Sequence, residues 1–164
     1  MNLSLKKRHY LMATILLAAC AVLLIIYRNY SAVMLEFAST DARLQAVILE
    51  ATPPDYLKYT RWSHHRWDMI SEFGTTLGIW KSGIDVNELR PVDVVRRISP
   101  RKLLIIGGGN DPIVPEFMTR ELYAAAHQPV SLWIVEGAQH GGYANVSAEY
   151  GNRLTEFFDG ALLH

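Results

Sequence analysis

Short apolar runs alternate with amphipathic stretches along the chain after residue 28. The apolar runs are continuous in their middle, which is typical of strands covered on both faces. We expect strands over residues 44–49, 103–106 and 131–135. Apolar residues at helical spacing predict helices at about 32–39, 115–126 and 148–163. This alternation indicates an α/β fold in which three parallel strands are flanked by helices.

Residues 52–100 interrupt the alternation. Two prolines open the segment, and tyrosines and tryptophans, among them Trp62, Trp67 and Trp80, are scattered among polar residues. We therefore expect a cap-like excursion from the sheet. Its aromatic side chains would either pack it against the core or line an acyl or peptide pocket.

The first thirty residues have a different pattern. A basic cluster at 6–9 precedes an uncharged, mostly apolar stretch over 10–27. About eighteen residues at roughly 1.5 Å each extend about 27 Å, close to the hydrocarbon thickness of a bilayer. The pattern predicts one transmembrane helix in contact with membrane lipid. Because basic residues stay on the cytoplasmic side, the N-terminus would be cytoplasmic and the C-terminal domain outside the cytoplasm.

Two other interpretations of this stretch remain open. Residues 17–20 resemble a lipobox, in which case the protein would be a lipoprotein lipidated at Cys20, or the segment would be a cleaved signal. The chain stays apolar after Cys20, which favours an uncleaved anchor. Alternatively, residues 23–27 form a buried strand. We divide the chain into an anchor or signal segment, 1–30, and a domain, 31–164.

Composition narrows the function. The chain has 164 residues, 50% of them hydrophobic, and a formal net charge of +0. It therefore has room for one compact domain, and no excess of Lys and Arg points to nucleic acid. A single cysteine excludes an intrachain disulfide and a cysteine-based metal site. We expect no metal and no cofactor.

Two polar residues follow the last two expected strands. Asp111 lies just past the strand over 103–106, and His140 lies in a glycine-rich turn after the strand over 131–135. The carboxyl ends of parallel strands share one rim of a sheet, where ligands and catalytic groups gather. A carboxylate that accepts from Nδ1 of a histidine leaves Nε2 free to take a proton from a nucleophile.

The sequence from about residue 92 onward resembles the C-terminal part of the α/β-hydrolases of the serine peptidase and esterase type. The resemblance rests on an ordered series of short motifs, which includes Asp-Pro-Ile-Val-Pro at 111–115 and Gly-Ala-Gln-His at 137–140. In that family the triad order is serine, acid, histidine. The resemblance implies Asp111 as the acid and His140 as the base of acyl transfer on an ester, amide or peptide.

The nucleophile that this family requires is not visible. Its Gly-x-Ser-x-Gly elbow should fall at 27–31, where Arg28 or Asn29 occupies the nucleophile position and Ser31 aligns with a glycine. The family's upstream strands and oxyanion loop are also replaced by the apolar segment. Loss of one oxyanion donor costs roughly 3 to 4 kcal/mol in known cases. We expect a truncated hydrolase domain that is inactive as this chain alone, with a sheet edge that a partner chain could complete.

Two classes of function follow. The first is a serine-hydrolase-type enzyme whose nucleophile is supplied elsewhere or lost. The second is a non-catalytic single-pass membrane protein or pseudoenzyme that serves as an interaction module. A reactive serine distinguishes them, so the sequence leaves the catalytic status uncertain.

Overall fold

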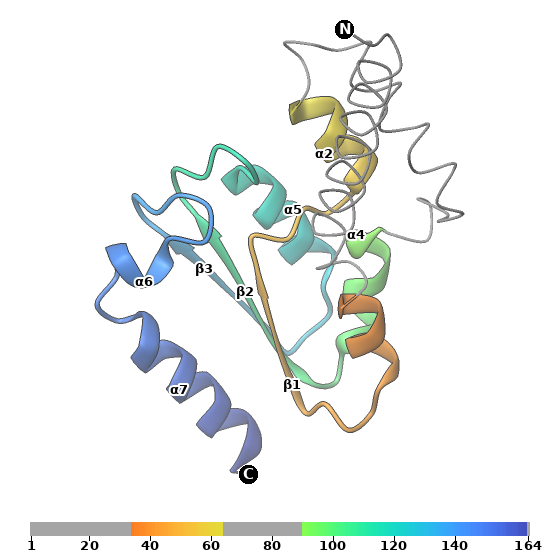
Figure 1. Ribbon diagram of the computed structural model, residues 1–164. Coiled ribbons are helices and arrows are strands. Elements are labelled where there is room, and N and C mark those ends of the chain that lie inside the picture. Colours follow the sequence, from red (N-terminus) through yellow and green to blue (C-terminus); the bar gives the residue numbers. More distant parts are fainter. Residues whose placement is uncertain (1–33, 64–89, 164) are drawn as a thin grey trace, which may run out of the picture. The chain divides into compact units, whose positions relative to one another are not determined.

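A computed structural model of the chain describes residues 34–63 and 90–163, all within one compact unit, Ser31–His164 (Figure 1). The expected membrane segment, 10–27, lies outside the described residues and stays a prediction. In the part of the chain that the structure describes, no helix is both long and apolar enough to cross a bilayer.

Three parallel strands form the sheet, in the order β1-β2-β3 (Figure 1). They are β1 (Ala46–Glu50), β2 (Lys102–Gly108) and β3 (Val130–Val135). The predicted α/β class of the domain and its three parallel strands are confirmed. Strand β1 begins two residues later than expected, because the backbone N–H of Leu44 donates to the carbonyl of Asp41 and closes a turn.

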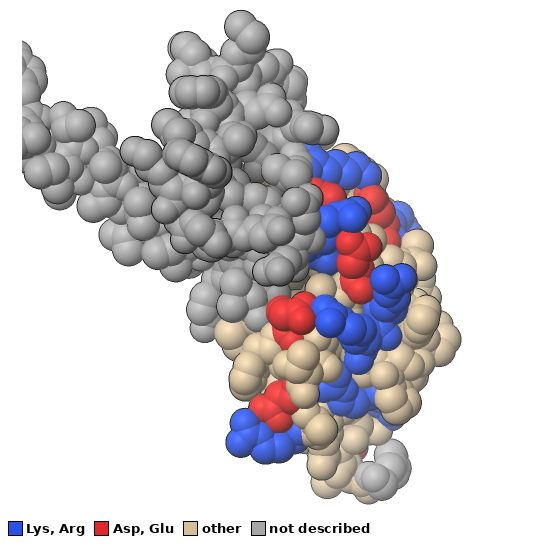
Figure 2. All heavy atoms as spheres, turned by 90° about the vertical axis from the view of Figure 1, so that its right-hand side faces the viewer, with Lys and Arg blue, Asp and Glu red and all other residues tan. Residues whose placement is uncertain are grey.

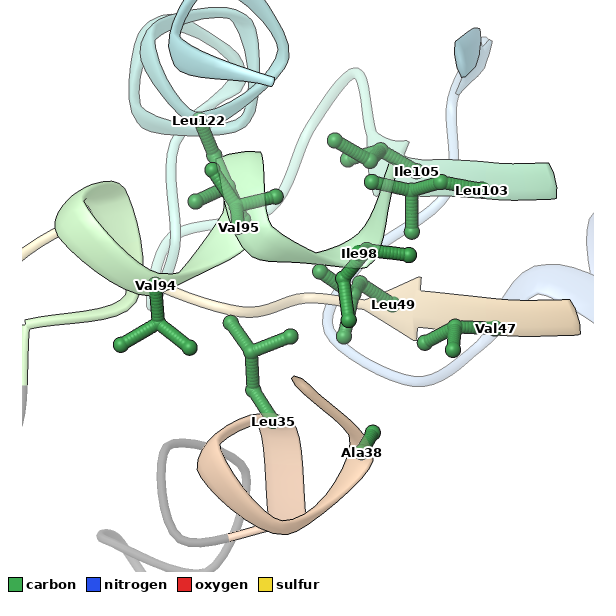
Figure 3. Close-up of a cluster of buried hydrophobic side chains, with 10 residues drawn as sticks. All are labelled: Leu35, Ala38, Val47, Leu49, Val94, Val95, Ile98, Leu103, Ile105 and Leu122. Carbon is green, nitrogen blue, oxygen red and sulfur yellow. The ribbon is translucent and has the colours of Figure 1, made fainter. Parts of the chain in front are cut away.

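Alternate side chains of β2 point into two separate apolar layers. Leu103 and Ile105 belong to one buried cluster, and Leu104 and Ile106 belong to another. The first layer contains the helix over 34–40, α4 (Pro91–Val94), the 3₁₀ helix η1 (Val95–Ile98) and α5 (Glu116–Ala125) (Figures 1 and 3). The second contains α6 (Tyr143–Val146) and α7 (Tyr150–Leu162). Coverage of both faces explains why β2 is a continuous apolar run.

The segment between β1 and β2 differs from the expected excursion at its second end. Helix α2 (Tyr56–Ser63) follows β1, but α4 and η1 contribute Val94, Val95 and Ile98 to the core of the first layer (Figure 3). Residues 64–89 lie outside the described chain. Nε of Arg90 is 2.9 Å from Oδ2 of Asp55, so the two flanks of the segment are joined by an ion pair.

The last predicted helix, 148–163, is shorter than expected. Helix α7 begins at Tyr150, and the four-residue α6 precedes it. None of the α7 side chains is fully buried, but Tyr150, Leu154 and Phe157 pack against the second layer. The helix is therefore attached to the sheet along a single stripe.

Charged side chains of both signs lie close together on the surface, and Figure 2 shows them intermixed on one face. Ion pairs such as Arg97 to Glu36 and Lys58 to Glu121 link different elements. The face shown in that view has no large patch of one sign of charge, in agreement with the zero net charge of the chain.

Arg101 closes the C-terminal end of the helix over 34–40. Its Nη1 donates to the carbonyls of Ala38 at 2.6 Å and Asp41 at 3.1 Å, and its Nη2 donates to the carbonyl of Ser39 at 3.1 Å. The last carbonyls of a helix have no partner within the helix. One guanidinium thus satisfies two of them, those of Ala38 and Ser39, and joins the helix to the start of β2.

We predict that Arg101→Ala lowers the free energy of unfolding by about 1–3 kcal/mol, because several charge-assisted bonds to backbone carbonyls are lost. Urea denaturation followed by circular dichroism measures the change. Arg120→Ala is the control, since it removes only an exposed pair with Glu116 in the same helix and should cost no more than about 0.5 kcal/mol. Equal losses in the two variants would contradict the capping role.

Candidate active site

Asp111 lies in the turn after β2 and is held by backbone amides. Its Oδ1 accepts from the N–H of Ile113 at 2.7 Å and from the N–H of Val114 at 2.9 Å. An aspartate that accepts from the amides two and three residues later is typical of a tight turn. The side chain is completely buried, so these bonds satisfy one carboxylate oxygen where water cannot.

The second oxygen of Asp111 faces His140. Nδ1 of His140 is 2.9 Å from Oδ2 of Asp111, and 39% of the histidine side chain is exposed. An ionised carboxylate can only accept a hydrogen bond, so this contact is satisfied when Nδ1 carries the hydrogen, which leaves the lone pair of Nε2 free in a neutral ring. The structure therefore brings together the two residues that the sequence singled out, in the orientation that suits a base.

The turn of Asp111 and the turn of His140 are bonded to each other directly. The backbone N–H of Asn110 donates to the carbonyl of Ala138 at 3.0 Å. A Cβ at Gly108 would lie 2.4 Å from that same carbonyl oxygen. Gly141, next to His140, has a φ of +67°, a conformation that glycine adopts without strain. Gly108 at the end of β2 thus allows the close approach of the two turns, and Gly141 allows the backbone conformation that follows His140.

Sequence reasoning missed three residues beside this pair. Glu50 ends β1 at the same rim, and the hydroxyl of Tyr150 donates to its Oε1. Tyr143, three residues after His140, is only 1% exposed and stacks on Tyr150 with ring centroids 6.1 Å apart. The one signal was a tyrosine shortly after the expected histidine turn. The bond between Tyr150 and Glu50 joins residues a hundred positions apart, so no local pattern predicts it.

Burial and negative charge keep both tyrosines protonated. Burial, followed by the nearby carboxylates of Asp111 and Glu50, raises the pKa of Tyr143 well above its usual value. Burial, followed by the hydrogen bond to Glu50, raises the pKa of Tyr150 to about 12. Both phenols are therefore neutral over the physiological pH range.

The other residues considered from sequence lie elsewhere. The expected nucleophile position, 27–31, together with Trp67 and Trp80, falls outside the described residues. The hydroxyl of Ser39 donates to the carbonyl of Glu36 at 2.8 Å. Trp62 packs edge-on against Phe117, with ring centroids 6.4 Å apart. Over residues 34–63 and 90–163, no group of three His, Cys, Asp or Glu side chains could hold a metal ion.

Comparison with known proteins identifies the fold. No protein-family model matches the sequence, and none of the curated proteins does. Solved structures do match. An α/β hydrolase from Penicillium shares 17% identity with a TM-score of 0.57, over 82% of this chain and 61% of that one. The chain has part of the α/β-hydrolase fold.

Two further solved structures match the chain over most of its length. An esterase domain from Rhodothermus marinus shares 21% identity with a TM-score of 0.56, over 78% of this chain and 55% of that one. A puromycin-hydrolysing peptidase from Mycobacterium tuberculosis shares 19% identity with a TM-score of 0.59, over 76% of this chain and 19% of that one. The chain thus spans less than two thirds of each of these three structures.

We predict that Gly108→Ala lowers the free energy of unfolding by about 1–3 kcal/mol, because the added methyl must push the turn of His140 away from β2. Thermal and urea denaturation measure the loss. Gly151→Ala, in α7 with nothing within 4 Å of the added Cβ, is the matched control and should instead gain up to about 1 kcal/mol. If Gly108→Ala is as stable as the unchanged protein, the close approach is wrong.

Proposed function

We propose that this chain carries the acid and base half of a serine-hydrolase-type acyl-transfer site, with Asp111 as the acid and His140 as the base. One observation supports this most directly, the 2.9 Å contact between Nδ1 of His140 and Oδ2 of Asp111. The hydrolase fold and its esterase and peptidase neighbours agree with it. The substrate class is an ester, amide or peptide.

The chemistry follows from the orientation of the imidazole. Nε2 of His140 accepts the proton of an attacking hydroxyl, and Asp111 stabilises the imidazolium that forms. The same Nε2–H then protonates the leaving group. Because two backbone amides fix Asp111 from behind, the carboxylate keeps its position while the charge on the ring changes.

The acid and base pair needs a nucleophile that neither of its two residues supplies. A hydroxyl from another segment or another chain would have to reach Nε2, and the sequence at 27–31 offers Asn29 and Arg28 in its place. Neither can attack a carbonyl as a serine does. We therefore propose that this chain alone is inactive, which leaves a pseudoenzyme interaction module as the second function.

We also propose a location and a partner. Residues 10–27 would anchor the chain in the membrane, with the domain outside the cytoplasm. Resistance of the protein to alkaline carbonate extraction tests the anchor.

Within the described sheet, β1 pairs only with β2, so a partner chain could add a strand to its other edge. A folded protein that is strictly monomeric in detergent would contradict the partner.

The state of Nε2 is tested by acylation with diethyl pyrocarbonate, located by mass spectrometry. We expect Asp111→Asn to slow the modification of His140 and to leave the exposed His127 unchanged. The Asn oxygen would keep the two amide bonds, so its NH₂ group would face Nδ1 and move the ring hydrogen to Nε2. Unchanged acylation of His140 in this variant would contradict the proposed acid and base roles.

The absence of a working nucleophile is tested with a fluorophosphonate probe on the detergent-solubilised chain. We expect no adduct on folded protein, because a histidine base without a positioned hydroxyl does not react by this route. His140→Ala serves as the matched control. An adduct on one serine that disappears in His140→Ala would show that the chain is a complete hydrolase.

A further inference from the structure

Three aromatic rings form a stack from the outer part of the sheet to the turn of His140. Trp133 on β3 stacks on Tyr150 with ring centroids 6.0 Å apart, and Tyr150 stacks on Tyr143 at 6.1 Å. The guanidinium of Arg153 lies 4.6 Å from the ring of Trp133 at the outer end. We call Trp133, Tyr150 and Tyr143 the aromatic stack. It connects α7 and β3 to the first residue of α6.

The aromatic stack is fixed to the sheet at its centre. The hydroxyl of Tyr150 donates to Glu50, the last residue of β1. Strand β1 is joined to β2 through five consecutive registered pairs. A shift of α7 relative to the sheet would therefore separate Tyr150 from its stacking partners and break its bond to Glu50.

His140 lies between two fixed points of the chain. Before it, Ala138 is fully buried and its carbonyl accepts from Asn110. After it come Gly141, with nothing within 4 Å of an added Cβ, and Gly142. Tyr143 is the first side chain after His140 that is packed, and it is almost completely buried. The ring of Tyr143 thus determines where the second half of the turn lies.

We propose that Tyr143 and Tyr150 are positioning residues that hold Nδ1 of His140 against Asp111 through the aromatic stack and the bond to Glu50. The inference deepens the proposed function, because it assigns the support of the same acid and base pair. Neither tyrosine touches a substrate in this role. Both act only on the placement and the tautomer of the imidazole.

The test uses the full chain in detergent with ¹⁵N-labelled histidine. The imidazole ¹⁵N shifts and the downfield Nδ1 proton report which nitrogen carries the hydrogen and whether it is bonded to a carboxylate. The chain has six histidines, and the signal of His140 is the one that disappears in His140→Gln. This signature requires no catalytic activity.

We expect Tyr143→Leu to lose the downfield Nδ1 proton and to show the other tautomer, because a branched aliphatic side chain cannot stack on Tyr150. Tyr143→Phe keeps the ring and should restore the signature. Tyr150→Leu is the second variant should Tyr143→Leu fail to fold. Tyr123→Leu is the matched control, since Tyr123 is a partly buried tyrosine packed in the other apolar layer.

Each outcome decides the proposal. Loss of the signature in folded Tyr143→Leu or Tyr150→Leu, with retention in Tyr123→Leu and Tyr143→Phe, supports it. Retention in a folded stack variant, or equal loss in Tyr123→Leu, overturns it and leaves the acid and base roles intact. A signature that is absent from the unchanged protein as well would overturn the pair itself, and with it the proposed function.

Discussion

Parallel pairing of β2 with a strand on each side is the constraint from which the rest of this structure follows. The strand is covered on both faces and bonded along both edges, so its backbone polar groups are satisfied without water. Strands that run the same way must end at the same rim. The turns that follow β2 and β3 therefore meet, and Asp111 comes within 2.9 Å of His140.

The buried charge of Asp111 is acceptable only because the surrounding turns supply donors. Two amides of its own turn bond one oxygen, and the imidazole bonds the other. A buried carboxylate without such partners would cost several kcal/mol. The bonds that stabilise the charge also fix its direction, so the requirement of folding and the placement of Asp111 against His140 coincide here. Gly108 permits both by leaving room for the carbonyl of Ala138.

The proposed support of His140 comes from helix α7, which supplies neither the acid nor the base. Helix α7 buries no side chain fully, yet its first residue, Tyr150, links the ring of Tyr143 to Glu50 on β1. A helix attached along one stripe can in this way contribute to a site at the rim of the sheet. In the proposed site, the nucleophile would have to come from outside the described residues.

The sequence by itself determined the α/β class, the three strands and the choice of Asp111 and His140. These depend on local signals, namely short apolar runs and the turn residues just beyond them, which parallel topology then brings to one rim. Only the tertiary structure decided that α4 and η1 belong to the core and that Glu50, Tyr143 and Tyr150 come together near the rim where the pair lies. Their contacts join residues up to a hundred positions apart. The local sequence around a single apolar or acidic residue does not specify which distant residue it will contact in the folded chain.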